Sequence, residues 1–182
     1  ARVDDQWNPL PGGRETFKVD CLGLNYGFTP STELTHTVGC EHECRPEMRY
    51  WTPKYNDSLE TTQPGIFVAG DCIGVGGVKT AMLEGEIVGT EVARQLERFA
   101  EEEARGKLSN IRTKLARYDS YKKMLKEIYE FRPGLLKLLT DDTLVCRCEE
   151  IDFKGIKDAI ENKGISHIDP LKRLLRTGMG RC

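Results

Sequence analysis

The amino-acid sequence predicts an α/β fold followed by a small all-α domain. A short apolar run at residues 66–69 leads through glycines into a long helical pattern, and this order of strand, turn and helix is typical of an α/β sheet. Shorter helical patterns, with cysteines on both sides, occupy the C-terminal part. The chain has 182 residues, 38% of them hydrophobic, which is enough for one large or two small cores.

Composition and charge exclude several classes of function. Lys and Arg total 27 against 29 Asp and Glu, so no strong positive field attracts nucleic acid. No apolar run reaches the ~20 residues that a membrane span requires, and the first residues lack the apolar stretch of a signal peptide. We therefore expect no nucleic-acid partner, no membrane span and a cytoplasmic location. The start at Ala1, which reads as the middle of a strand, leads us to expect a piece of a longer polypeptide.

The seven cysteines favour thiols that act as ligands in a reducing compartment. Their number is odd, whereas a secreted disulfide framework usually has an even count in a shorter chain. The cysteines are Cys21, Cys40, Cys44, Cys72, Cys146, Cys148 and Cys182.

The N-terminal region is predicted to contain a hairpin. Residues 15–24 alternate and then become largely apolar, as a strand does when it enters a covered sheet. The turn-forming residues 9–13 precede this strand, so Val3 and its neighbours are expected to pair with it. Gly27 and Pro30 then end the strand.

The most specific pattern runs from Glu60 to the helix that follows Gly77. Pro64-Gly65 is a turn, residues 66–69 form a buried strand, and Gly70-Asp71 brings a carboxylate to the end of the strand, where ligands bind in α/β sheets. Apolar or small residues then recur every three or four positions, which predicts a helix with one side facing a core. That side comprises Val78, Ala81, Met82, Gly85, Val88, Gly89, Val92, Ala93, Leu96, Phe99 and Ala100.

This arrangement suits a flavin. The N-terminus of a helix carries unpaired N–H groups and a partial positive charge, which stabilise the anionic part of a reduced isoalloxazine ring. Asp71 can accept a hydrogen bond from a ribityl or ribose hydroxyl. An ordinary strand–turn–helix with a surface Asp is the alternative for an isolated Gly-Asp pair.

Residues 60–89 resemble the second FAD-contact motif of the two-dinucleotide-binding-domain flavoprotein superfamily. The resemblance implies that FAD is bound through Gly70, Asp71, Gly76, Gly77, Val78 and Ala81. The GxGxxG unit that forms the primary FAD site of the superfamily is absent near the start of this sequence. We therefore expect the chain alone to bind FAD weakly or not at all, with the missing portion supplied upstream or by another chain. NAD(P) binding is left open.

The C-terminal cysteines predict a metal or iron–sulfur centre. Cys146-Arg147-Cys148 is followed by a helix that Asp152 caps and Gly164 ends, and Asp169-Pro170 opens a second helix. The run Gly178-Met179-Gly180 then leads to Cys182. Thiolates that converge in this way are the natural ligands of iron–sulfur clusters.

This region resembles the bacterioferritin-associated-ferredoxin-like 2Fe-2S domain. The resemblance implies that Cys146, Cys148 and Cys182 hold the cluster, while the fourth cysteine of that family is absent from this chain. We expect no intact four-cysteine cluster here unless a thiol from elsewhere completes it.

The combined pattern resembles the α-type subunits of heteromeric amine or imino-acid dehydrogenases, the family of opine oxidase, dye-linked L-proline dehydrogenase and hydrogen cyanide synthase. The resemblance implies that a catalytic β-type flavoprotein subunit oxidises a C–N bond, and that this FAD-dependent subunit relays the electrons within a hetero-oligomer. No catalytic residue is assigned to this chain.

The resemblance also implies a division into domains. Residues 1–35 end an NAD-binding-like domain and residues 36–105 form the C-terminal part of an FAD-binding domain. Residues 106–140 form a helical connector, expected to pack without a cofactor role, and residues 141–182 form a truncated 2Fe-2S-binding-like helical domain.

Other functions remain open at this point. Cys40, His42 and Cys44 bring soft ligands close together, but their spacing is unlike that of structural zinc sites, and their role is not assigned. A non-catalytic iron–sulfur or zinc-binding module is one alternative, and an NAD(P)H-dependent reductase of the nitrite reductase type is another. The absence of Cys-x-x-Cys argues against a dithiol–disulfide oxidoreductase.

Overall fold

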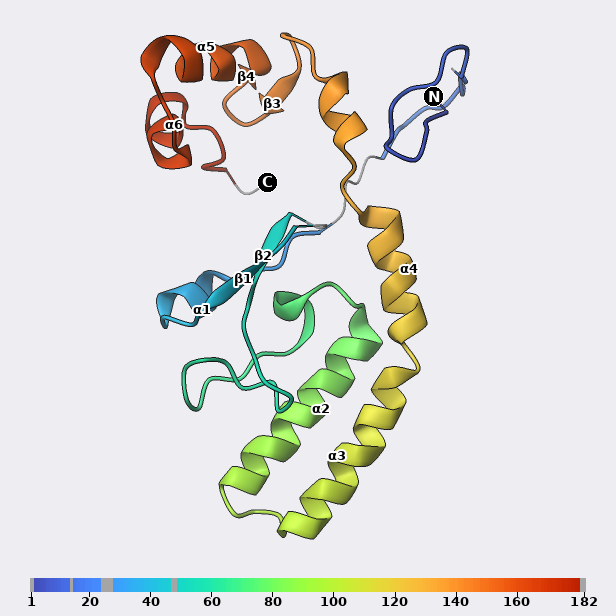
Figure 1. Cartoon of the computed structure of the whole chain (residues 1–182), viewed down its shortest axis with the longest axis vertical. Coiled ribbons are helices and arrows are strands. Elements are labelled where there is room, and N and C mark those ends of the chain that lie inside the picture. The colour runs from blue at the N-terminus through green and yellow to red at the C-terminus, as the bar shows by residue number, and fades with distance from the viewer. Residues whose placement is uncertain (1, 14, 24–27, 47–48, 181–182) are drawn as a thin grey trace. The chain divides into compact units, whose positions relative to one another are not determined.

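The computed structural model describes residues 2–13, 15–23, 28–46 and 49–180 (Figure 1). The chain folds into two compact units. Residues 19–131 form one unit, and residues 1–18 together with residues 132–182 form the other. The domain boundaries expected from the sequence stay predictions. Parts of two expected features, Leu24 and Gly27 of the first strand and Cys182 of the cluster site, lie outside the described residues.

The unit of residues 19–131 combines a β-hairpin with helices. The short helix α1 (Glu33–Thr37) precedes strands β1 (His42–Arg45) and β2 (Tyr50–Pro53), which pair antiparallel. A 3-10 helix (Gly70–Ile73) then leads to the three long helices of this unit. They are α2 (Val78–Gln95), α3 (Glu101–Ala116) and α4 (Asp119–Tyr129).

Helices α2 and α3 lie side by side and form the apolar core of this unit (Figure 1). Ile87 of α2 meets Leu108 and Ile111 of α3, and Leu59 completes the buried cluster. Each of these four side chains is at most 8% exposed. The helical connector expected over residues 106–140 is divided into separate helices, because α3 ends at Ala116 and α4 begins at Asp119.

The side of α2 that is buried differs from the expected one. Val78 and Met82, expected to face a core, are 73% and 63% exposed, whereas Glu84 and Glu91 are 5% and 4% exposed. The helix also ends at Gln95 rather than continuing to Ala100. The apolar periodicity did not predict this buried side, because two of the buried residues are glutamates. Each glutamate has a cationic partner, which compensates for the loss of water on burial.

The two strands expected at residues 15–24 and 66–69 are not formed by the described residues. Phe17 and Leu22 are 74% and 71% exposed, and Val3 pairs with Pro9 instead of with this segment. Residues 66–68 fold back on residues 59–61, with a single bridge between Glu60 and Phe67. A strand requires a ladder of hydrogen bonds to a neighbour, and in the described residues these two segments have no such ladder.

The second unit joins both ends of the chain. The N-terminal loop closes through a hydrogen bond from the Arg2 N–H to the Gly13 carbonyl at 2.7 Å, and Gly134 donates its N–H to the carbonyl of Gln6 at 2.8 Å. A 3-10 helix (Pro133–Leu138) precedes the remaining elements, which are β3 (Leu144–Cys146), β4 (Ile151–Asp152), α5 (Phe153–Lys163) and α6 (Ile168–Leu175).

The cap and end residues predicted for the first C-terminal helix are confirmed, whereas the second helix begins at Ile168 with His167 as its N-cap, so that Asp169 lies inside its first turn and does not cap it. The Asp152 carboxylate accepts a hydrogen bond from the N–H of Gly155 at 2.8 Å, and Gly164 ends α5 in the left-handed conformation. Pro170 lies in the first turn of α6. The region was expected to be all-α, but β3 and β4 form a short antiparallel pair, so that expectation is corrected. The strands arise because the chain turns back between Cys146 and Ile151.

Candidate functional site

A glycine-rich loop joins the 3-10 helix at Gly70 to the start of α2. Gly70, Gly74 and Gly77 have φ values of 77°, 131° and 86°, a region that favours glycine. A Cβ atom on Gly76 would lie 2.6 Å from the Thr80 hydroxyl oxygen. No side chain caps the N-terminus of α2 at Gly77, so its first N–H groups have no side-chain acceptor.

The six residues predicted to bind FAD follow one another along this loop and the first turn of α2. Gly70 is buried against Ala81, to which an added Cβ would approach within 3.3 Å. Asp71 and Val78 are exposed, and Gly76 is buried. The loop therefore presents a carboxylate and an uncapped helix end, and four of its eight residues are glycines.

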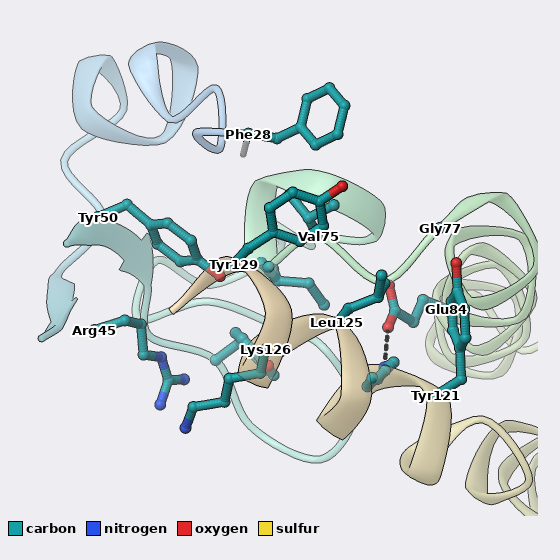
Figure 2. A pocket seen from close by; sticks show the side chains of 14 residues that line it. Phe28, Arg45, Tyr50, Val75, Gly77, Glu84, Tyr121, Leu125, Lys126 and Tyr129 are labelled. Carbon is teal, nitrogen blue, oxygen red and sulfur yellow. Dashed lines mark hydrogen bonds and ion pairs between the residues drawn. The ribbon is translucent and has the colours of Figure 1, made fainter. Parts of the chain in front are cut away.

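One carboxylate ties this loop to two helices. Glu84 accepts a hydrogen bond from the N–H of Gly70 at 2.9 Å with one oxygen. The other oxygen accepts a hydrogen bond from the Lys122 ammonium at 2.9 Å (Figure 2). The Glu84 side chain lies on α2 and Lys122 lies on α4, so three segments meet at this group.

A cavity of about 490 Å³ lies beside the glycine loop (Figure 2). Gly74, Val75 and Gly77 form one side, and the β-hairpin contributes Arg45 and Tyr50. Helix α4 contributes Tyr121, Lys122, Leu125, Lys126 and Tyr129. Phe28, Tyr55, Ile73 and Glu84 complete the lining.

Sequence reasoning missed this contribution, because α4 was expected to be a packing connector. Tyr121, Leu125 and Tyr129, spaced four residues apart, are a pattern that could have indicated an aromatic helix face.

The second candidate site surrounds Cys146. Its thiol is 3% exposed and accepts hydrogen bonds from backbone N–H groups, first that of Gly178 and then that of Glu149, which hold the pKa of Cys146 below its usual value. Gly180 lies against Cys148, since a Cβ on Gly180 would be 2.6 Å from the Cys148 sulfur. The segment after α6 thus returns to both cysteines. Cys182 itself is outside the described residues.

The Cys40–Cys44 segment does not assemble a metal site in the part of the chain that the structure describes. Cys40 is buried and its thiol donates a hydrogen bond to the Thr61 hydroxyl at 3.3 Å. The two ring nitrogens of His42 contact the Cys40 carbonyl and the Thr35 hydroxyl, and its ring stacks on His36 at 3.6 Å. Among the described residues, no group of three potential ligand side chains gathers anywhere.

Comparison with known families assigns the chain to a family of redox enzymes. The sequence model of the pyridine nucleotide-disulphide oxidoreductases matches residues 4–95, which is half of the chain. The chain belongs to this family. Membership gives the unit that carries the glycine loop the character of an FAD- or NAD(P)-binding domain from a redox enzyme.

Individual relatives agree with this assignment. Hydrogen cyanide synthase subunit HcnB of Pseudomonas aeruginosa is 31% identical over 192 residues, which cover 100% of this chain and 39% of that protein. An opine oxidase subunit of Rhizobium meliloti is 31% identical, and the match covers 94% of this chain and 32% of that protein. Its counterpart in Agrobacterium tumefaciens is 29% identical, and the match covers 93% of this chain and 34% of that protein. The resemblance to these two kinds of subunit is thereby confirmed.

The matches cover only part of the length of each relative. The chain spans 32–39% of the length of these three relatives. No solved structure matches the sequence. Among the helices of the described residues, none has the length and apolar character needed to cross a membrane.

Proposed function

We propose that this oxidoreductase chain is the C-terminal part of a subunit that binds FAD at the glycine loop and a 2Fe-2S cluster at Cys146, Cys148 and Cys182. In this proposal, the subunit relays electrons released when a C–N bond of an amino acid, imino acid or opine is oxidised. The names of the relatives, which include opine oxidase subunits, support this substrate class.

The observation that carries the FAD assignment is the loop from Gly70 to Gly77 and the uncapped start of α2. Positive φ values and the absence of Cβ atoms let a ligand approach the backbone closely. The exposed Asp71 carboxylate suits a ribityl hydroxyl, and the free N–H groups at the start of α2 suit a carbonyl or anionic ring atom. The cavity beside the loop has the volume of a small-molecule site.

The cluster assignment is supported by the donors around Cys146. Backbone N–H groups that bind the sulfur favour its thiolate form, which is the form that ligates iron. A reducing compartment such as the cytoplasm suits Cys146 and Cys148, which form no disulfide. When bound, FAD would exchange electrons in pairs or singly, and the cluster would take them one at a time.

The partner in this proposal is a catalytic β-type flavoprotein subunit. The relatives carry the word subunit in their names, and this chain has no residue assigned to act on the substrate. The rest of the FAD site would come from a portion of the protein upstream on the same chain or on another chain.

The deciding experiment is cofactor analysis of the intact protein that contains this chain, purified with its partners in the absence of oxygen. We expect flavin absorption together with iron and acid-labile sulfide. Iron without flavin would favour an iron–sulfur module, and zinc without colour would favour the Cys40–Cys44 site. A protein with neither flavin nor iron would refute the proposal.

A further inference from the structure

The buried side of α2 carries two ion-paired glutamates. Glu84 is 5% exposed and Glu91 is 4% exposed, two turns apart on the same helix. A buried carboxylate is tolerated only when hydrogen bonds and cations compensate for the lost water. The partners of each glutamate therefore show what that carboxylate holds in place.

Glu84 holds the glycine loop. Its carboxylate accepts the N–H of Gly70, the residue that immediately precedes Asp71. Gly70 has a φ of 77° and lies against Ala81. Because glycine has access to many backbone conformations, this hydrogen bond selects one of them for the loop.

The same carboxylate also holds α4. Lys122 reaches it at 2.9 Å, and Lys122 belongs to the helix that contributes Tyr121 and Tyr129 to the cavity. Loop, α2 and α4 are thus joined at one buried group. Loss of this group would release both the loop and one wall of the cavity.

Glu91 provides the contrast. Its partners are the Ser58 hydroxyl at 3.0 Å, Arg94 at 2.9 Å and Arg112 at 3.6 Å. None of these residues belongs to the glycine loop or lines the cavity. Glu91 therefore has the same burial and the same kind of ion pair without contact to the candidate site.

We infer that Glu84 is a positioning residue for FAD: it holds Gly70 and Asp71 in the binding conformation, and through Lys122 it keeps α4 against the cavity. This inference rests on the proposed FAD site. Glu84 also lines the cavity, but its two carboxylate oxygens are engaged by Gly70 and Lys122, so the inference gives it a positioning role and no part in the electron transfer itself.

Two double variants separate the loop hydrogen bond from the ion pair. Glu84→Gln with Lys122→Met removes both charges and leaves an amide oxygen that accepts the N–H of Gly70. Glu84→Leu with Lys122→Met removes the same charges together with that acceptor. The pair Glu91→Gln and Glu91→Leu is the matched control for a buried glutamate remote from the loop.

The measurement is the dissociation constant of FAD for the intact protein, followed by flavin fluorescence after the cofactor has been removed and added back. We expect the Glu84→Leu double variant to bind FAD about ten- to a hundredfold more weakly, because it leaves the buried N–H of Gly70 without an acceptor. The Glu84→Gln double variant should stay within about threefold of the wild type, because it keeps the acceptor. Both Glu91 variants should lose thermal stability without a change in FAD affinity.

Hydrogen exchange of the protein without FAD gives a second readout. Both double variants should exchange faster over residues 119–129, since each lacks the Lys122 contact, and only the Leu variant should also exchange faster over residues 69–74. Equal FAD affinity of the Gln and Leu double variants would overturn the inference, as would weaker FAD binding by the Glu91 variants to the same degree. A wild-type protein that binds no FAD would instead refute the proposed function.

Discussion

Gly70 shows at the scale of one residue how the loop depends on backbone freedom. Its φ of 77° is a conformation that costs an L-residue about 1–2 kcal/mol, and an added methyl group would meet the Ala81 Cβ at 3.3 Å. We expect Gly70→Ala to lower the free energy of unfolding by about 1–3 kcal/mol and to weaken FAD binding. Denaturant unfolding and FAD titration of the intact protein measure the two effects.

The control for this prediction is Gly85→Ala on α2. Gly85 is helical and exposed, and a Cβ there meets no atom within 4 Å. Because alanine favours the helix over glycine by about 0.5–1 kcal/mol, this variant should be as stable as the wild type or more so. If both alanine variants behave alike, the strain assigned to Gly70 is absent.

His42 makes the stability of its unit depend on pH. Burial, and then the charge of the stacked His36, hold the pKa of His42 below its ordinary value of 6.5. The unfolded chain therefore takes up a proton at a higher pH than the folded chain. Stability should be complete above about pH 6.5 and should fall as the pH decreases through the pKa of the folded state.

The variant His42→Gln tests this effect. It removes the ionisable ring while leaving an amide near the Thr35 hydroxyl and the Cys40 carbonyl. Thermal unfolding recorded between pH 7.5 and pH 5, within the titration range of histidine, should show a smaller pH dependence for the variant than for the wild type. An identical slope in both proteins would mean that another group titrates.

At the scale of elements, local patterns predicted the helices better than the sheet. Helix α5 follows from its cap at Asp152 and its end at Gly164, because both act within one turn of the helix. The strand expected at residues 66–69 and the buried side of α2 depend on neighbours that lie far along the chain. The polar burial of Glu84 was invisible in the hydrophobic pattern, since its cation, Lys122, comes from another helix.

The cap of α5 leads to a prediction for that helix alone. Asp152→Ala removes the acceptor of the Gly155 N–H and should lower the free energy of unfolding by about 1 kcal/mol. Asp152→Ser should restore most of this loss, because serine caps helices nearly as well. Hydrogen exchange of α5, residues 153–163, distinguishes loss of the cap from a general loss of stability.

For the molecule as a whole, the two candidate sites belong to different compact units. The glycine loop lies in residues 19–131, and Cys146 and Cys148 lie in the unit that includes residues 132–182. The residues that the sequence assigns to each site stay predictions, and the structure adds groups that only tertiary contacts reveal, namely the Glu84 carboxylate and the N–H donor of Gly178. Sites built in separate units should lose their cofactors independently.

The variant Cys146→Ala tests this independence in the intact protein. The thiolate that Gly178 and Glu149 stabilise is lost, so the cluster should be absent, while the Gly70–Asp71 loop and its Glu84 contact are unchanged and FAD should remain. Iron analysis should show loss of the metal at unchanged flavin content. The electron donor should then reduce the flavin, and the electrons should not pass beyond it.

The matched control is Cys44→Ser, which changes an exposed thiol on β1. It should leave the iron and flavin contents as they are in the wild type. Loss of iron from this variant with iron retained in Cys146→Ala would move the metal to the Cys40–Cys44 segment. Loss of flavin from Cys146→Ala would show instead that the two sites depend on each other, because a thiol of one unit affects the flavin of the other only if the two units are coupled in the assembled protein.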